Sequence, residues 1–235
     1  KTVSGFFWAF IDAIGYQGIQ FFVLIILARI LQPAEFGLIA MLTIFISLGQ
    51  VFIDSGFATA LIQKKKANYI DENSIFYFNI FCGIVSFILL WSTAPWISRF
   101  FNEPSLIILT RVLSFTFIID SLGILQYTLM KRSINFHKLA KISLIASSLS
   151  GIIAISMAYN DLGVWSLVGY TVFNKLFRLC LYWIFNTWRP GLIFSLNSLR
   201  SMFNYGINIL FVSLLQTVFN NLYFLVIAKL FTPAD

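Results

Sequence analysis

Long apolar runs dominate the sequence, and Pro, Gly and charged residues separate one run from the next. Runs of about 18 or more apolar residues are typical of helices that cross a lipid bilayer. These runs do not alternate polar and apolar residues as the strands of a membrane barrel do. The pattern predicts seven membrane-spanning helices, at 5–31, 36–62, 74–98, 105–130, 138–159, 163–186 and 202–231.

The composition supports this interpretation. Hydrophobic residues make up 59% of the chain and charged residues only 11%, whereas about a quarter of the residues in soluble domains are charged. Only helices and closed barrels satisfy their backbone hydrogen bonds within hydrocarbon. We therefore predict an all-α polytopic membrane protein.

The net charge of +7 is unevenly distributed among the predicted connections between helices. The first, third and fifth connections carry two bases, Arg29 and Arg99. Connections rich in Lys and Arg usually face the cytoplasm, so we expect the N-terminus and the even-numbered connections to lie there, and we expect no nucleic-acid partner. The second, fourth and sixth connections carry nine bases: Lys64, Lys65, Lys66, Lys131, Arg132, Lys138, Lys141, Arg189 and Arg200.

A ten-residue pattern occurs twice. Residues 26–35 read ILARILQPAE, and 226–235 read VIAKLFTPAD, 200 positions later. Solenoid and propeller repeats are about 20 to 50 residues long, so this spacing predicts two repeated lobes. We assign 1–186 to a six-helix lobe, 187–201 to a cytoplasmic linker and 202–235 to the first helix of a second lobe, within a longer, truncated protein. An even number of spans separates the copies, which predicts parallel repeats.

Four predicted helices carry polar residues at helical spacing. A charge at the bilayer centre costs about 2.5 to 3.5 kcal/mol on insertion scales, so such residues usually face a cavity or a partner. When Gln216 and Asn220 are shifted by 200 positions, they fall on Tyr16 and Gln20. The residues are Asp12, Tyr16 and Gln20; Thr43, Ser47, Gln50 and Asp54; Thr171, Asn174, Lys175, Arg178 and Tyr182; and Gln216 and Asn220.

Simpler explanations exist for several of these residues. Asp12 and Asp54 lie near the predicted cytoplasmic ends, where interfacial water would satisfy them. Ser47, Gln50 and Asn174 have the chemistry of ordinary hydrogen bonds between helices.

Two mid-span cations are harder to explain by packing. Lys175 and Arg178 lie one helical turn apart on one face of the predicted sixth span, and we expect them to serve function. Arg111 and Asp120 are nine residues apart and lie on different faces of the fourth span, so we do not expect a pair within that helix.

The residues that usually carry enzymatic chemistry are not grouped. The single histidine, His137, has no Cys or carboxylate at ligand spacing, which argues against a metal site. No Gly-rich phosphate-binding loop occurs, and Cys82 and Cys180 lie within apolar runs as free thiols. We therefore expect a protein that is not an enzyme, without a metal or cofactor.

Four segments resemble the polysaccharide-transporter family, the Wzx-type exporters of O-antigen, colanic acid and teichuronic acid. They are DSGFATALIQKK at 54–65, LMKRSINFHKLAKISLIASSLSGIIAI at 129–155, GVWSLVGY at 163–170 and WRPGLIFSLNSLRSMFNYG at 188–206. This family belongs to the multidrug/oligosaccharidyl-lipid/polysaccharide exporter superfamily. The resemblance covers essentially the whole chain.

The resemblance implies two six-helix bundles around a V-shaped cavity in the bacterial cytoplasmic membrane. The implied substrate is an undecaprenyl-pyrophosphate-linked oligosaccharide turned from the cytoplasmic to the outer leaflet by alternating access, and polysaccharide-assembly proteins are possible partners. In this interpretation Lys175 and Arg178 hold the pyrophosphate. The other candidate cavity residues contact sugar or a coupling ion: Asn174, Asp12, Gln20, Gln50, Asp54 and Asn220.

Two other functions stay open from the sequence. One is a drug/cation antiporter of the same superfamily, although such a cavity would favour buried acids over Lys175 and Arg178. The other is a membrane scaffold for polysaccharide assembly without transport of its own, which has no need of mid-span cations.

Overall fold

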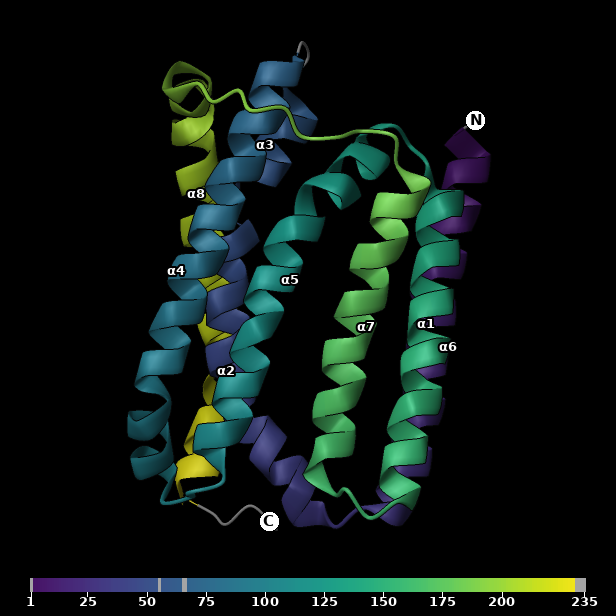
Figure 1. Ribbon diagram of the computed structural model, residues 1–235, viewed down its shortest axis with the longest axis vertical. Coiled ribbons are helices and arrows are strands. Elements are labelled where there is room, and N and C mark those ends of the chain that lie inside the picture. The colour runs from purple at the N-terminus through teal and green to yellow at the C-terminus, as the bar shows by residue number, and fades with distance from the viewer. Residues whose placement is uncertain (1, 55, 65–66, 231–235) are drawn as a thin grey trace.

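All regular structure in the part of the chain that the computed structural model describes is helical (Figure 1), as the sequence predicts. The backbone is described at 2–54, 56–64 and 67–230, and the side chains at 2–7, 9, 11, 12, 204 and 222–230 are not described. The helices are α1 (Thr2–Ile30), α2 (Pro33–Asp54), α3 (Phe57–Gln63), α4 (Tyr69–Phe101), α5 (Leu106–Arg132), α6 (Phe136–Tyr159), α7 (Val164–Phe185) and α8 (Leu196–Leu230).

The long helices form an up-and-down bundle in which the chain reverses direction at each connection (Figure 1). The connections around α3, between α5 and α6, and before α8 lie at the same end as the N-terminus, at the top of the view. The short connections at 31–32, 102–105 and 160–163 lie at the opposite end. The base-rich connections of the sequence are therefore gathered at one end of the bundle.

Not every predicted span is apolar enough to cross a membrane by itself. Among the described helices, α1, α2, α4, α5 and α6 are long and apolar enough to do so, and α8 becomes a sixth if its two bent parts count as one span. Helix α7 is not among them, although it packs within the bundle against α5 and α6. Its polar residues Asn174, Lys175 and Arg178 lower its hydropathy.

Small residues bring the helices of one side of the bundle close together. A Cβ atom at Gly151 of α6 would lie 2.5 Å from Val23 Cγ2 of α1, and one at Gly15 of α1 would lie 2.7 Å from Leu144 Cδ2 of α6. Close approach of this kind is how helices gain packing contacts in lipid. On the other side, α2, α4 and α5 share an apolar core that includes Leu42, Leu109 and Phe117.

The predicted span at 36–62 is wrong, because the helix breaks after Asp54 and a second, short helix follows. Helix α2 ends at Asp54, and Gly56 has a φ angle of +68° before α3 begins at Phe57. A Cβ atom at residue 56 would lie 2.3 Å from the carbonyl oxygen of Gly206 in α8. The break therefore lets α8 approach the backbone between α2 and α3.

The last helix starts before the span predicted at 202–231. Helix α8 begins at Leu196 rather than at 202, and it bends by 55° between Leu196–Phe203 and Tyr205–Asn221. The preceding chain is fixed by backbone donors: Gly191 N donates to Asn73 Oδ1 at 2.6 Å, and Ser195 N donates to Ser74 Oγ at 2.9 Å.

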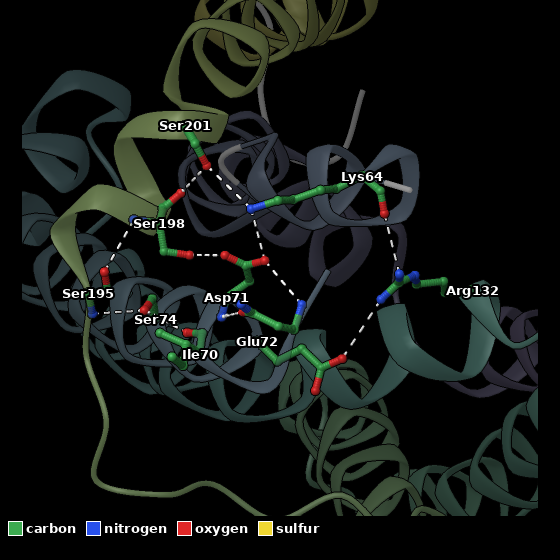
Figure 2. A network of polar contacts seen from close by, with 10 residues as sticks. Lys64, Ile70, Asp71, Glu72, Ser74, Arg132, Ser195, Ser198 and Ser201 are labelled. Carbon is green, nitrogen blue, oxygen red and sulfur yellow. Dashed lines mark hydrogen bonds and ion pairs between the residues drawn. The ribbon is translucent and has the colours of Figure 1, made fainter. Parts of the chain in front are cut away.

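A polar network holds the start of α8 on the rest of the bundle (Figure 2). The buried carboxylate of Asp71 in α4 forms an ion pair with Lys64 at 2.8 Å and accepts a hydrogen bond from Ser198 of α8. Arg132 of α5 donates to the carbonyl oxygen of Lys64 at 3.3 Å and lies 3.8 Å from Glu72. These contacts anchor the first turns of α8 to α4. The bend sets these turns at an angle to the remainder of the helix.

We predict that Gly56→Ala destabilises the fold by about 1 to 3 kcal/mol or more, because alanine is strained at this φ angle and its Cβ atom would meet Gly206. Gly18→Ala in α1 is the matched control, since no atom lies within 4 Å of the Cβ position there. The control should be neutral or stabilising by up to about 1 kcal/mol. Thermal unfolding of the two variants in detergent measures the difference, and equal midpoints would contradict the proposed close contact.

Candidate functional site

A polar cavity of about 620 Å³ opens between α2, α5, α7 and α8, and we call it the α8 chamber. Its polar lining includes Ser47, Gln50 and Asp54 of α2, Asp120 of α5, Asn174, Lys175 and Arg178 of α7, Tyr16 of α1, and Ser213, Gln216, Thr217 and Asn220 of α8. With Thr59 of α3, polar side chains from six helices thus converge within a bundle whose outer surface is largely apolar.

A buried ion pair lies in the wall of this chamber. Lys175 of α7 pairs with Asp120 of α5 and also donates to Gln50 Oε1 of α2 at 3.2 Å. The two charged side chains are only 22% and 19% exposed. A pair in such surroundings binds each partner strongly, because removal of one leaves the other charge buried and uncompensated.

Arg178, one turn further along α7, is bound differently. Its guanidinium carbon lies 4.5 Å from the centre of the Tyr16 ring of α1, and its Nε atom is buried without a hydrogen bond. It forms no ion pair within the part of the chain that the structure describes. Among the described residues, the chamber therefore contains one cation paired with a carboxylate, Lys175, and one without an ion pair, Arg178, whose guanidinium group lies over an aromatic face.

A second cavity of about 510 Å³ lies between α1, α2 and α7, and we call it the α1 chamber. It is lined by residues 36–43 of α2, whereas the α8 chamber is lined by residues 46–54, so the two follow one another along this helix. Tyr16, Asn174 and Lys175 line both chambers. The charged cluster therefore lies where the two cavities meet.

Most of the predicted cavity residues come together. The α8 chamber is lined by Gln50, Asp54, Asn174, Lys175, Arg178 and Asn220, and the α1 chamber by Gln20, Asn174 and Lys175. The side chain of Asp12 lies outside the described residues. Asn174 also has a packing role, since its Nδ2 donates to Ser150 Oγ of α6 at 3.1 Å.

Asp120 is not among the site residues that the sequence predicts, because its spacing relates it only to Arg111 of the same helix. A carboxylate in the middle of a span needs a counterion, and that rule combined with the mid-span Lys175 could have indicated the pair. Arg111 itself lies over the Trp91 ring of α4 at 5.2 Å, so the two are not paired with each other, as predicted.

The remaining residues with reactive side chains lie elsewhere. His137 packs edge-on against Trp8 with ring centres 4.2 Å apart. Cys82 and Cys180 are free thiols, as predicted. Among the described residues, no group of three His, Cys, Asp or Glu side chains is arranged to hold a metal ion.

Comparison with known proteins identifies the family. Residues 26–235 match the model of a family described as polysaccharide biosynthesis protein. The chain belongs to this family. The resemblance found in the sequence is thereby confirmed, and the bundle is that of a multi-pass membrane protein from a family of polysaccharide biosynthesis proteins.

Curated relatives agree with this membership. The chain is 29% identical over 234 residues to the lipopolysaccharide biosynthesis protein WzxC of Escherichia coli (strain K12). This alignment covers 98% of this chain and 47% of WzxC. It is 27% identical to the teichuronic acid biosynthesis protein TuaB of Bacillus subtilis (strain 168), over 88% of this chain and 43% of TuaB. The succinoglycan biosynthesis transport protein ExoT of Rhizobium meliloti (strain 1021) is also 27% identical, over 85% of this chain and 41% of ExoT.

The chain spans less than half the length of each of these relatives. No solved structure matches it.

We predict that Lys175→Met and Asp120→Leu each destabilise the bundle by about 3 to 5 kcal/mol, because each leaves a buried charge unpaired. The double variant should recover most of this loss, since neither charge then remains. Lys141→Met, at an exposed position of α6, is the control and should change stability by less than about 0.5 kcal/mol. Thermal unfolding in detergent gives the cycle, and strictly additive losses would show that the pair contributes nothing.

Proposed function

We propose that the protein to which this chain belongs exports a lipid-linked oligosaccharide across the bacterial cytoplasmic membrane. In this proposal the substrate is an undecaprenyl-pyrophosphate oligosaccharide, and its head group crosses through the α8 chamber while its lipid remains in the bilayer. The protein is then a transporter rather than an enzyme. Its product serves the assembly of a surface polysaccharide.

One observation carries the proposal: a chamber inside a membrane bundle contains a cation, Arg178, that no carboxylate neutralises within the described residues. A guanidinium group binds phosphate oxygens through two parallel hydrogen bonds, and such bonds are strong where water is scarce. Gln50, Gln216 and Asn220 provide amides in the same chamber. The relatives' names, which refer to the biosynthesis of lipopolysaccharide, teichuronic acid and succinoglycan and in one case to transport, agree with a sugar-bearing substrate.

The proposed architecture has two lobes. Helices α1 to α7 form the first lobe, and α8 is the first helix of a second lobe that completes the cavity by rocking against the first. The exposed polar residues Gln216 and Asn220 of α8 lie on the cavity side, which agrees with a shared cleft. The base-rich end of the bundle, with the N-terminus, faces the cytoplasm in this proposal.

A specific observation favours cation antiport as a second candidate. The α8 chamber contains two carboxylates, Asp54 and Asp120, and Asp54 forms no ion pair among the described residues. Asp54 is among the cavity residues predicted from the sequence, and Asp120 adds a second acid, so the preference of a cation-binding cavity for buried acids does not exclude this candidate. A chamber with both positive and negative side chains can also bind a cation, so transport of an organic cation has to be measured as well.

We predict that the full-length protein, in vesicles with a fluorescent polyprenyl-pyrophosphate oligosaccharide, speeds transfer of the label between leaflets. Arg178→Gln should slow this transfer by about 10- to 100-fold, because a hydrogen bond to a charged phosphate is lost. Arg99→Gln, at an exposed position near the end of α4, is the matched control and should transfer at the unmutated rate. A membrane-impermeant quencher reports how much label has changed leaflet.

The outcomes separate the candidates. If the unmutated protein does not speed transfer but exchanges a fluorescent organic cation against a proton or sodium gradient, the antiporter interpretation replaces ours. If both variants transfer at the unmutated rate, the protein exports the lipid but Arg178 does not hold its phosphate.

A further inference from the structure

The hydroxyl group of Tyr170 is buried at the α1 chamber and has no hydrogen-bond partner among the described residues. Tyr170 is only 7% exposed, and its hydroxyl oxygen makes no hydrogen bond within the described part of the chain. A buried hydroxyl without a partner costs free energy, so such groups in native proteins call for an explanation. Because Tyr170 lines the cavity, a bound molecule can supply the missing partner.

Two threonine hydroxyl groups of this chamber are arranged to accept hydrogen bonds. Thr43 Oγ1 donates its proton to the carbonyl oxygen of Ile39 at 3.0 Å, and Thr171 Oγ1 donates to that of Leu167 at 3.1 Å. Each oxygen keeps lone pairs free to accept. Tyr170 can act as a donor, and the Gln20 amide can act as both donor and acceptor. The chamber lining therefore contains both hydrogen-bond donors and hydrogen-bond acceptors.

The charge in this chamber is already compensated. Among the described lining residues, Lys175 is the only charged one, and it is held by Asp120 and Gln50. This described lining therefore offers no unpaired cation to an anionic ligand and no carboxylate to a cationic one. Neutral groups that both donate and accept hydrogen bonds, as sugar hydroxyls do, fit this lining best.

The rest of the wall is apolar. Leu24, Phe36, Ile39 and Leu167 line the chamber beside the polar groups. A sugar ring carries hydroxyl groups at its edge and C–H groups on its faces, so it needs both kinds of surface. The volume of about 510 Å³ lies within the range of about 300 to 1,000 Å³ that small-molecule sites occupy.

We propose that the α1 chamber is a saccharide subsite that binds uncharged sugar rings of the head group, with Tyr170 as a hydrogen-bond donor. This inference rests on the proposed function. Since Tyr16, Asn174 and Lys175 line both chambers, sugars in the α1 chamber lie next to a phosphate held at Arg178. The phosphate and the sugars are thereby bound on opposite sides of the Lys175–Asp120 pair.

The test compares two soluble probes on the purified full-length protein: a short-chain prenyl pyrophosphate, and the same molecule carrying a neutral disaccharide. Tyr170→Phe removes only the hydroxyl and should weaken binding of the disaccharide probe by about three- to tenfold, the loss of one hydrogen bond. Binding of the sugar-free probe should not change. Tyr159→Phe, at an exposed position at the end of α6, is the matched control and should change neither dissociation constant.

A second measurement excludes a structural role for the hydroxyl. Without ligand, Tyr170→Phe should unfold at the same temperature as the unmutated protein or at a higher one, because the hydroxyl has no partner to lose. A lower unfolding temperature would show that the hydroxyl supports the fold, and the inference would fall.

The outcomes also distinguish this inference from the proposed function. If the unmutated protein binds the sugar-free probe and the disaccharide adds no affinity, or if Tyr170→Phe weakens both probes equally, the subsite is wrong while phosphate binding stands. If neither probe binds, both the subsite and the proposed function are overturned.

Discussion

The ion pair between Lys175 and Asp120 is the interaction on which the interior of this bundle depends. Neither charge is tolerated alone within an apolar bundle, and each becomes acceptable because the other lies against it. Lys175 also donates to Gln50, so the contact joins α7, α5 and α2. Helix α7 is less apolar than its neighbours, and its polar face is satisfied by these helices rather than by lipid.

The same pair gives the two cations of α7 different roles. Lys175 is paired with Asp120, whereas Arg178 lies over the Tyr16 ring. A cation on an aromatic face is held more weakly than one on a carboxylate in a buried site, so Arg178 is more available to an entering anion. The pair lies where the α8 and α1 chambers meet, and in our proposal it separates the phosphate from the sugars.

The sequence was sufficient for those features that depend on one helix at a time. Apolar runs indicated the helices, charged connections indicated their alternation, and helical spacing placed Gln50, Lys175 and Arg178 on faces that the structure brings together. Features that depend on distant segments could not be obtained in this way. The partner of Lys175 lies 55 residues away, and no pattern within α5 indicates toward which helix Asp120 points.

The break after α2 shows the same limit. A single glycine within an apolar run is compatible with a continuous helix, and the close approach of Gly56 to Gly206, far along the chain, cannot be seen from that run. The early start of α8 also depends on tertiary contacts, because Asp71 and Ser74 of α4 bind Ser198 and Ser195.

The central claim is that Asp120 serves as the internal counterion of an anion-binding cluster, and equilibrium binding of inorganic pyrophosphate to the full-length protein tests it most directly. Asp120→Asn removes one negative charge beside Lys175 while keeping the shape of the side chain, so binding should tighten by about tenfold. Glu103→Gln, the same change of charge in the connection between α4 and α5, should leave affinity unchanged. Unchanged or weaker binding by Asp120→Asn would contradict the account.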